Sequence, residues 1–188
     1  LEIGFGMGDS LFEMATQSRS TNFIGIEVHR PGVGHLLGLV HQEGLENVRV
    51  FREDSVEVLK SGLPDNILDK VQIFFPDPWH KKKHHKRRIV QTSFLDLLSR
   101  KLKTNGTVHI ATDWENYAEH IMETLEAHPH FKNIAGGHIY SERPKDRPLT
   151  NCPVKLSLFG SLGCRHPLDG GTNIIKCAQR SSSSLERY

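Results

Sequence analysis

LEIGFGMGDSLFE, residues 1–13, joins a short apolar segment to three glycines and then to the beginning of a helical pattern. Glycines at such a junction allow the backbone to turn sharply and allow a ligand to approach the N-terminus of the helix. Ser10 and Glu13 have the spacing of a capping box, which favours a helix start directly after the glycines. The segment therefore predicts the first strand–helix unit of an α/β fold, with a ligand at its turn.

The pattern of this first unit is repeated along the chain. Short apolar segments alternate with helical periodicity up to residue 112, which indicates a mainly parallel twisted sheet with helices on both faces. The predicted strands are Leu1 to Gly4, Asn22 to Glu27, Asn47 to Phe51, Asp69 to Phe75, and Gly106 to Thr112. Three apolar stripes with helical spacing, to which we assign core packing and no chemistry, span Val33 to Val40, Val90 to Leu102, and Trp114 to Leu125.

Composition limits the class of protein. The 188 residues, 37% of them hydrophobic, suffice for one domain with its own core. The sequence has no apolar run of membrane-spanning length and no signal-peptide pattern, which predicts a soluble, cytoplasmic protein. Its three cysteines argue against a disulfide framework. Neither the adjacent pair His84 and His85 nor the cysteines with His166 have the spacing of zinc ligands, so no metal site is predicted.

An acid at the end of the second strand points to an adenosine cofactor. Glu27 follows the glycines by about 20 residues, where a carboxylate can accept hydrogen bonds from two ribose hydroxyls. This pattern fits a nicotinamide dinucleotide as well as S-adenosylmethionine. The G-x-G-x-G spacing and the acid Glu2 favour the latter, because an anion suits a sulfonium and repels a pyrophosphate. Asp54, after the third strand, has two open roles, adenine recognition and helix capping with Glu57.

FFPDPWHKKKHHKRR, residues 74–88, leads from the fourth strand into concentrated positive charge. Residues 80–88 hold four Lys, two Arg and three His with no acid, in a chain whose formal net charge is +2. Such a surface attracts a polyanion, and its place after a strand puts it at the rim of the predicted cofactor site. The prolines on both sides of Asp77 restrict the turn that carries it, while Trp79 is left as a stacking face or an anchor of the loop.

These motifs resemble those of the bacterial tRNA (guanine-N7)-methyltransferases. The resemblance covers about residues 1–150 and is carried by residues 1–8, 25–29, 74–88 and 111–115. It implies a Rossmann-like methyltransferase fold that uses S-adenosylmethionine to methylate N7 of a guanine in the tRNA variable loop. The implied cofactor-binding residues are Glu2, Gly4, Gly6, Gly8, Glu27, Asp54 and Asp77. The implied tRNA contacts are Lys81, Asp113 and Thr150, with a basic track of Lys82, Lys83, Lys86, Arg87 and Arg88.

Asp77 is also the catalytic residue that the resemblance implies. Guanine N7 carries a lone pair and no proton, so methylation needs no general base and alignment of the reactants should dominate. The product is a cationic purine, which a carboxylate can stabilise. Asp113 ends the fifth strand, where capping of the next helix by Thr112 and Glu115 competes with a substrate contact.

The resemblance ends at Thr150. We predict a methyltransferase domain over residues 1–150 that lacks its N-terminal extension, and an atypical tail over 151–188 that is frameshifted or disordered. Val154 to Phe159 and Thr172 to Cys177 are candidate strands, but a final antiparallel hairpin is doubtful. Two other functions stay open: a non-catalytic RNA-binding remnant and a nicotinamide-dependent oxidoreductase. No protein partner is expected, and both a monomer and a homodimer are compatible with the sequence.

Overall fold

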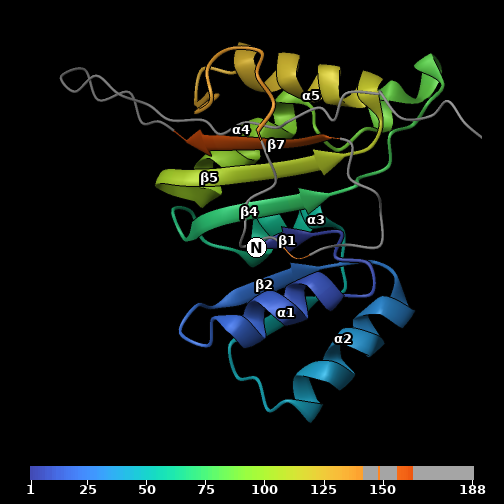
Figure 1. Cartoon of the computed structure of the whole chain (residues 1–188), viewed down its shortest axis with the longest axis vertical. Coiled ribbons are helices and arrows are strands. Elements are labelled where there is room, and N and C mark those ends of the chain that lie inside the picture. Colours follow the sequence, from blue (N-terminus) through green and yellow to red (C-terminus); the bar gives the residue numbers. More distant parts are fainter. Residues whose placement is uncertain (142–147, 149–155, 163–188) are drawn as a thin grey trace, which may run out of the picture.

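The computed structural model describes residues 1–141, 148 and 156–162, which build a twisted sheet surrounded by helices (Figure 1). Within these residues the sheet has seven strands, in the order β3-β2-β1-β4-β5-β7-β6. The bounds of these strands are β1 Glu2–Ile3, β2 Phe23–Ile26, β3 Val48–Phe51, β4 Leu68–Phe74, β5 Leu102–Thr112, β6 Phe131–Lys132 and β7 Leu156–Leu162.

The five strands β1 to β5 pair in parallel, which confirms the sequence prediction. β5 begins earlier than predicted, at Leu102 rather than at Gly106. The pairing of β4 with β5 shifts register between Leu68 and Lys70, and the strand continues through this irregularity.

Helices cover both faces of the sheet: Figure 1 shows α1 in front of β2, whereas α3 and α4 lie behind β4 and β5. The helices are α1 Asp9–Gln17, α2 Arg30–Gln42, α3 Ser55–Glu57, α4 Thr92–Lys101 and α5 Glu115–Ala127, with a π-helical turn at Val58–Gly62 and a 3-10 helix at Lys82–Arg87. Pro31 lies in the first turn of α2, where its missing N–H breaks no helical hydrogen bond.

The two largest hydrophobic clusters of the described residues hold the layers together. In the larger one, Val71 of β4 and Ile110 of β5 pack with Leu98 of α4 and Ile121 of α5, and all four side chains are fully buried. The smaller cluster fixes the glycine-rich segment against α1 and α2, and its members are Phe5, Leu11, Met14, Val33 and Leu36. Apolar side chains of α1 and α2 therefore hold the glycine turn in place.

Two predicted core residues lie outside the core: one is Leu37, in the predicted stripe Val33 to Val40, which is 48% exposed, and the other is Trp114. The stripe on α5 is buried from Ala118 to Leu125, but its first member, Trp114, is 42% exposed. Trp114 is the N-cap residue and has extended backbone angles, so it precedes the inward-facing turns of the helix.

The far end of the sheet is antiparallel. β7 pairs with β5, where Leu156 lies opposite Thr112, and with β6 on its other side. The antiparallel closing pair that the sequence left doubtful is thus present, and β7 overlaps the predicted strand Val154 to Phe159. The predicted strand Thr172 to Cys177 and the predicted tRNA contact Thr150 lie outside the described residues. No helix in the described part of the chain is long and apolar enough to span a membrane.

Candidate functional site

The carboxyl ends of β1 to β4 surround a cavity of about 500 Å³. Its lining contains Gly4 after β1, Glu27 after β2, Asp54 after β3 and Asp77 after β4. β1 and β4 are neighbours although they are far apart in the chain, and this reversal of strand order is where open α/β sheets bind ligands. Four residues predicted separately to bind the cofactor therefore meet in one cavity.

The glycine turn owes its shape to left-handed backbone angles. Gly4, Gly6 and Gly8 have φ values of 73°, 60° and 86°, which other residues adopt only with strain. α1 begins directly after Gly8 without a side-chain capping bond, so the predicted capping box of Ser10 and Glu13 is wrong. The turn ends at Gly8 and α1 begins at Asp9 because of the positive φ of this glycine, and the Ser10 hydroxyl does not cap the helix.

Glu27 ties the glycine turn to the end of β2. Its Oε2 accepts a hydrogen bond from the backbone N of Gly6 at 2.8 Å, and its Oε1 accepts from Val28 N at 2.7 Å and His29 N at 2.9 Å. A carboxylate offers about four lone-pair positions, so one remains after these three bonds. Glu27 can accept from one ribose hydroxyl while it holds the loop.

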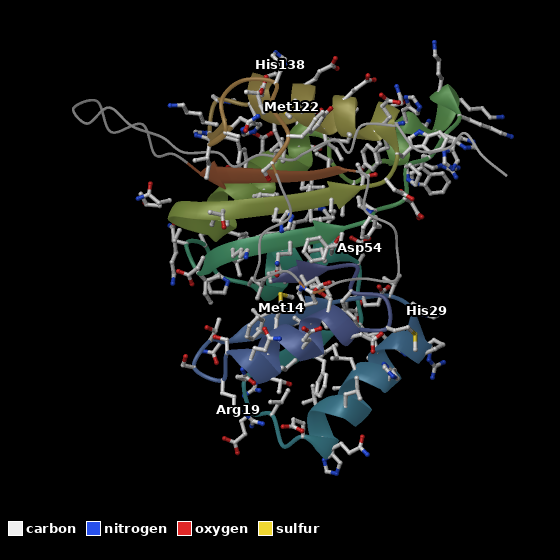
Figure 2. All side chains as sticks on the ribbon, viewed as in Figure 1. Met14, Arg19, His29, Asp54, Met122 and His138 are labelled. Atoms are coloured by element: carbon white, nitrogen blue, oxygen red, sulfur yellow. The ribbon has the colours of Figure 1, made fainter. Side chains whose placement is uncertain are left out.

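Asp54 performs the capping role that the sequence left open. Its Oδ1 accepts from Val56 N at 2.9 Å and from Glu57 N at 3.3 Å, which caps α3. No hydrogen bond to Oδ2 is formed within the described residues, and Asp54 lines the cavity at the strand ends (Figure 2). Capping therefore leaves one carboxylate oxygen for a ligand.

Glu2 is not among the residues that line the cavity, and its contact with the cofactor stays a prediction. It is 2% exposed and lies within the sheet, opposite Gly25 of β2 and Gln72 of β4. Successive strand residues point to opposite faces, and Ile3 is the β1 residue in the described lining. Gly6 and Gly8 likewise support the turn from outside that lining.

Gly32 supports the site although the sequence analysis did not select it. A Cβ at this position would lie 1.8 Å from the backbone oxygen of Gly6. The first turn of α2 therefore touches the glycine turn directly, and only glycine permits that distance. The available signal was a glycine next to Pro31 in a helix, where glycine is unfavourable unless a close approach requires it.

The basic loop reaches the cavity through Arg87. Its guanidinium carbon lies 5.0 Å from the centre of the Trp79 ring, and both residues line the cavity. His84 meets the same ring edge-on, with ring centres 5.8 Å apart. Trp79 thus anchors this loop. The track lysines Lys82, Lys83 and Lys86 are exposed, and so is the predicted tRNA contact Lys81.

Arg88 does not extend the exposed track, which corrects its predicted role. It is 2% exposed; its Nε donates to Pro78 O at 2.8 Å and its Nη2 donates to Asn116 Oδ1 at 2.9 Å. The guanidinium also lies 4.7 Å above the ring of Tyr117, and burial lowers the pKa of Arg88 below its ordinary value. Arg88 therefore connects the turn carrying Asp77 to α5.

Asp113 is exposed at the carboxyl end of β5, next to the turn after β4. The predicted capping box of Thr112 and Glu115 is wrong, because α5 begins at Glu115 and Thr112 Oγ1 accepts instead from Trp114 N at 3.2 Å. The structure therefore places Asp113 beside the candidate site without a capping bond. Within the described residues, no group of three His, Cys, Asp or Glu is arranged to hold a metal ion.

Comparison with known sequences identifies close relatives. A family model described as "Putative methyltransferase" matches residues 1–158. The tRNA (guanine-N(7)-)-methyltransferase of Idiomarina loihiensis is 59% identical over 150 residues, which are 80% of this chain and 61% of that protein. The protein of the same name from Shewanella amazonensis is 58% identical, over 80% of this chain and 63% of its own. The chain thus spans about three fifths of the length of these relatives.

Solved structures share the fold at much lower identity. A precorrin-6y C5,15-methyltransferase from Geobacter metallireducens matches with a TM-score of 0.59 and 18% identity, over 87% of this chain and 78% of that one. A SAM-dependent methyltransferase from Aquifex aeolicus matches with a TM-score of 0.56 and 19% identity, over 85% and 78% of the two chains. The architecture is that of the Rossmann-like methyltransferases.

Proposed function

This chain belongs to the methyltransferase family whose model matches residues 1–158, and we propose that it transfers a methyl group from S-adenosylmethionine to N7 of a guanine in tRNA. The observation that carries the proposal is the cavity at the ends of β1 to β4, where Gly4, Glu27, Asp54 and Asp77 form one lining. The target in the variable loop follows from the resemblance of the motifs.

The residues of the cavity fit the cofactor. Nothing lies within 4 Å of a Cβ built on Gly4, so the turn leaves room beside its backbone. Glu27 retains one lone-pair position for a ribose hydroxyl, and Asp54 retains Oδ2 for an amino group. Carboxylates in the lining also suit a positively charged ligand.

S-adenosylmethionine, when bound, would supply a methyl group on a positively charged sulfur. Asp77 then faces the reaction from the restricted turn between Pro76 and Pro78 and stabilises the positive charge that moves onto the guanine ring. The turn holds this carboxylate in place, so the main contribution of the chain is alignment and charge stabilisation rather than removal of a proton.

Methyl transfer is tested with labelled cofactor and a tRNA transcript that carries no modification. We expect label in the transcript and none in a second transcript whose target guanine is replaced by 7-deazaguanine, which lacks the accepting nitrogen. Label in both transcripts would show that the methyl group is transferred to an atom other than N7 of that guanine. Binding of tRNA with no label in either would leave the non-catalytic RNA-binding function, and binding of NAD in place of S-adenosylmethionine would support an oxidoreductase.

The exposed lysines should set the salt dependence of tRNA binding. Changing Lys82, Lys83 and Lys86 together to Gln removes three charges, so the slope of log K against log salt should become shallower by about 2. The measurement is filter binding of tRNA between low and moderate salt. Lys103→Gln is the control, because its Nζ pairs with Asp69 at the opposite end of β5. An equal change of slope in the control would contradict a local track.

Arg88→Gln should slow methyl transfer without changing that slope. The variant loses the bonds that hold Pro78 and the turn with Asp77, and a displacement of about 1 Å can cost 100-fold in rate. Single-turnover rates and thermal unfolding of the variant separate misplacement of the turn from loss of the fold. Asn116→Ala removes one partner of Arg88 and should have a smaller effect in the same direction. If Arg88→Gln makes the slope of log K against log salt for tRNA binding shallower, Arg88 contacts the RNA and its role is not limited to holding the turn.

A further inference from the structure

Trp114 is a large aromatic side chain that the fold leaves in solvent. It is 42% exposed, whereas Ala118, Ile121, Met122 and Leu125 further along α5 are at most 4% exposed. An exposed tryptophan is informative because burial of its ring would stabilise the fold, so its position suggests an external contact.

His80 connects this tryptophan to the turn of Asp77. The ring centres of His80 and Trp114 are 4.1 Å apart with an angle of 65° between the planes. His80 is itself exposed and follows the second proline of the turn by two positions. The two rings form an aromatic pair that spans the segment after β4 and the start of α5.

The pair lies beside the cavity. β4 and β5 are parallel neighbours in which Phe74 lies opposite Ala111, and Phe75 N donates to Ala111 O at 2.7 Å. Both segments therefore leave the sheet at the same edge. Asp77 lines the cavity and His80 follows it by three residues, whereas His80 and Trp114 are not among the lining residues, so the aromatic pair lies outside the cavity near the turn that carries Asp77.

We infer that Trp114, supported by His80, forms a stacking surface for an unpaired RNA base next to the methylated guanine. Exposed aromatic rings bordered by cations are typical of surfaces that bind single-stranded nucleic acid, and the exposed cations Lys81, Lys82 and Lys83 follow His80 directly. The inference rests on the proposed function, because it gives the tRNA substrate its second point of contact.

Stacking and phosphate pairing differ in their response to salt. We expect Trp114→Ala to weaken tRNA binding by roughly 10-fold at every salt concentration, since a base–aromatic stack is worth about that much and involves no counterions. The salt slope and the affinity for S-adenosylmethionine should stay as in the wild type. Trp114→Phe retains an aromatic face and should recover most of the affinity. Equal losses for Ala and Phe, or a loss confined to low salt, would overturn the inference.

Fluorescence tests the stack without any assay of methyl transfer. Trp79→Phe leaves Trp114 as the remaining one of two tryptophans, and a single-stranded oligonucleotide should quench its emission. An oligonucleotide of the same length without bases should bind through its phosphates and quench little. Equal quenching by both would overturn the stack. Failure of methyl transfer together with base-dependent quenching would reject the proposed reaction and retain the RNA contact.

Discussion

Replacing Asp77 with alanine is expected to lower the rate of methyl transfer to tRNA by about 10²- to 10³-fold, the usual loss when one electrostatic stabiliser of a transition state is removed. Asp77 is exposed in the cavity lining, so its side chain contributes little to the fold. The dissociation constant for tRNA should change little, because the basic track is intact. Single-turnover rates at saturating cofactor and filter binding of tRNA give the two quantities.

Asp77→Asn is the matched control, since it keeps the shape of the side chain and removes its charge. If charge stabilisation is the role of Asp77, the asparagine variant should be about as slow as the alanine variant. A wild-type rate in either variant would show that the Asp77 carboxylate has no role in methyl transfer. A loss of tRNA affinity as large as the loss of rate would make Asp77 a binding residue.

Gly32→Ala is expected to reduce the affinity for S-adenosylmethionine by at least 10-fold and to lower the free energy of unfolding by about 1–3 kcal/mol. The added methyl group would lie 1.8 Å from the backbone oxygen of Gly6, so either α2 or the glycine turn must move. Because Glu27 is bonded to Gly6 N, a displaced turn would also disturb the ribose position. Calorimetric titration with cofactor and urea unfolding measure the two effects.

Gly34→Ala provides a control within the same helix. A Cβ on Gly34 meets nothing within 4 Å, so this variant should bind cofactor normally and gain about 0.5–1 kcal/mol of stability from higher helix propensity. If the two alanine variants behave alike, the contact of Gly32 with the glycine turn has no role in cofactor binding.

Local pattern was enough to predict the central strands and the acids at their ends. Strand periodicity, the glycines and the position of Glu27 are features of short segments, and parallel strands bring their carboxyl ends to one edge whatever the details of packing. The meeting of Gly4, Glu27, Asp54 and Asp77 in one cavity follows from that rule.

The residues whose position the sequence analysis misjudged or missed are placed by tertiary contacts. Arg88 has the same local sequence context as Arg87, and only its bonds to Pro78 and Asn116 reveal that it is buried. Trp114 fits the apolar stripe of α5 but precedes the helix that buries the stripe. Gly32 is defined by a contact with Gly6, a residue distant in sequence. None of these contacts leaves a periodic signal.

The reversal of strand order between β1 and β4 divides the described chain into two parts, for which we propose different tasks. Segments after β1, β2 and β3 contain residues proposed for the methyl donor alone, whereas those after β4 and β5 contain Asp77, which is proposed for both substrates, and the residues proposed for the acceptor. The acceptor side could therefore be exchanged for that of another methyltransferase of this architecture while the donor side is kept. A chimera built at this division that keeps Asp77 should retain its donor affinity and adopt a new acceptor.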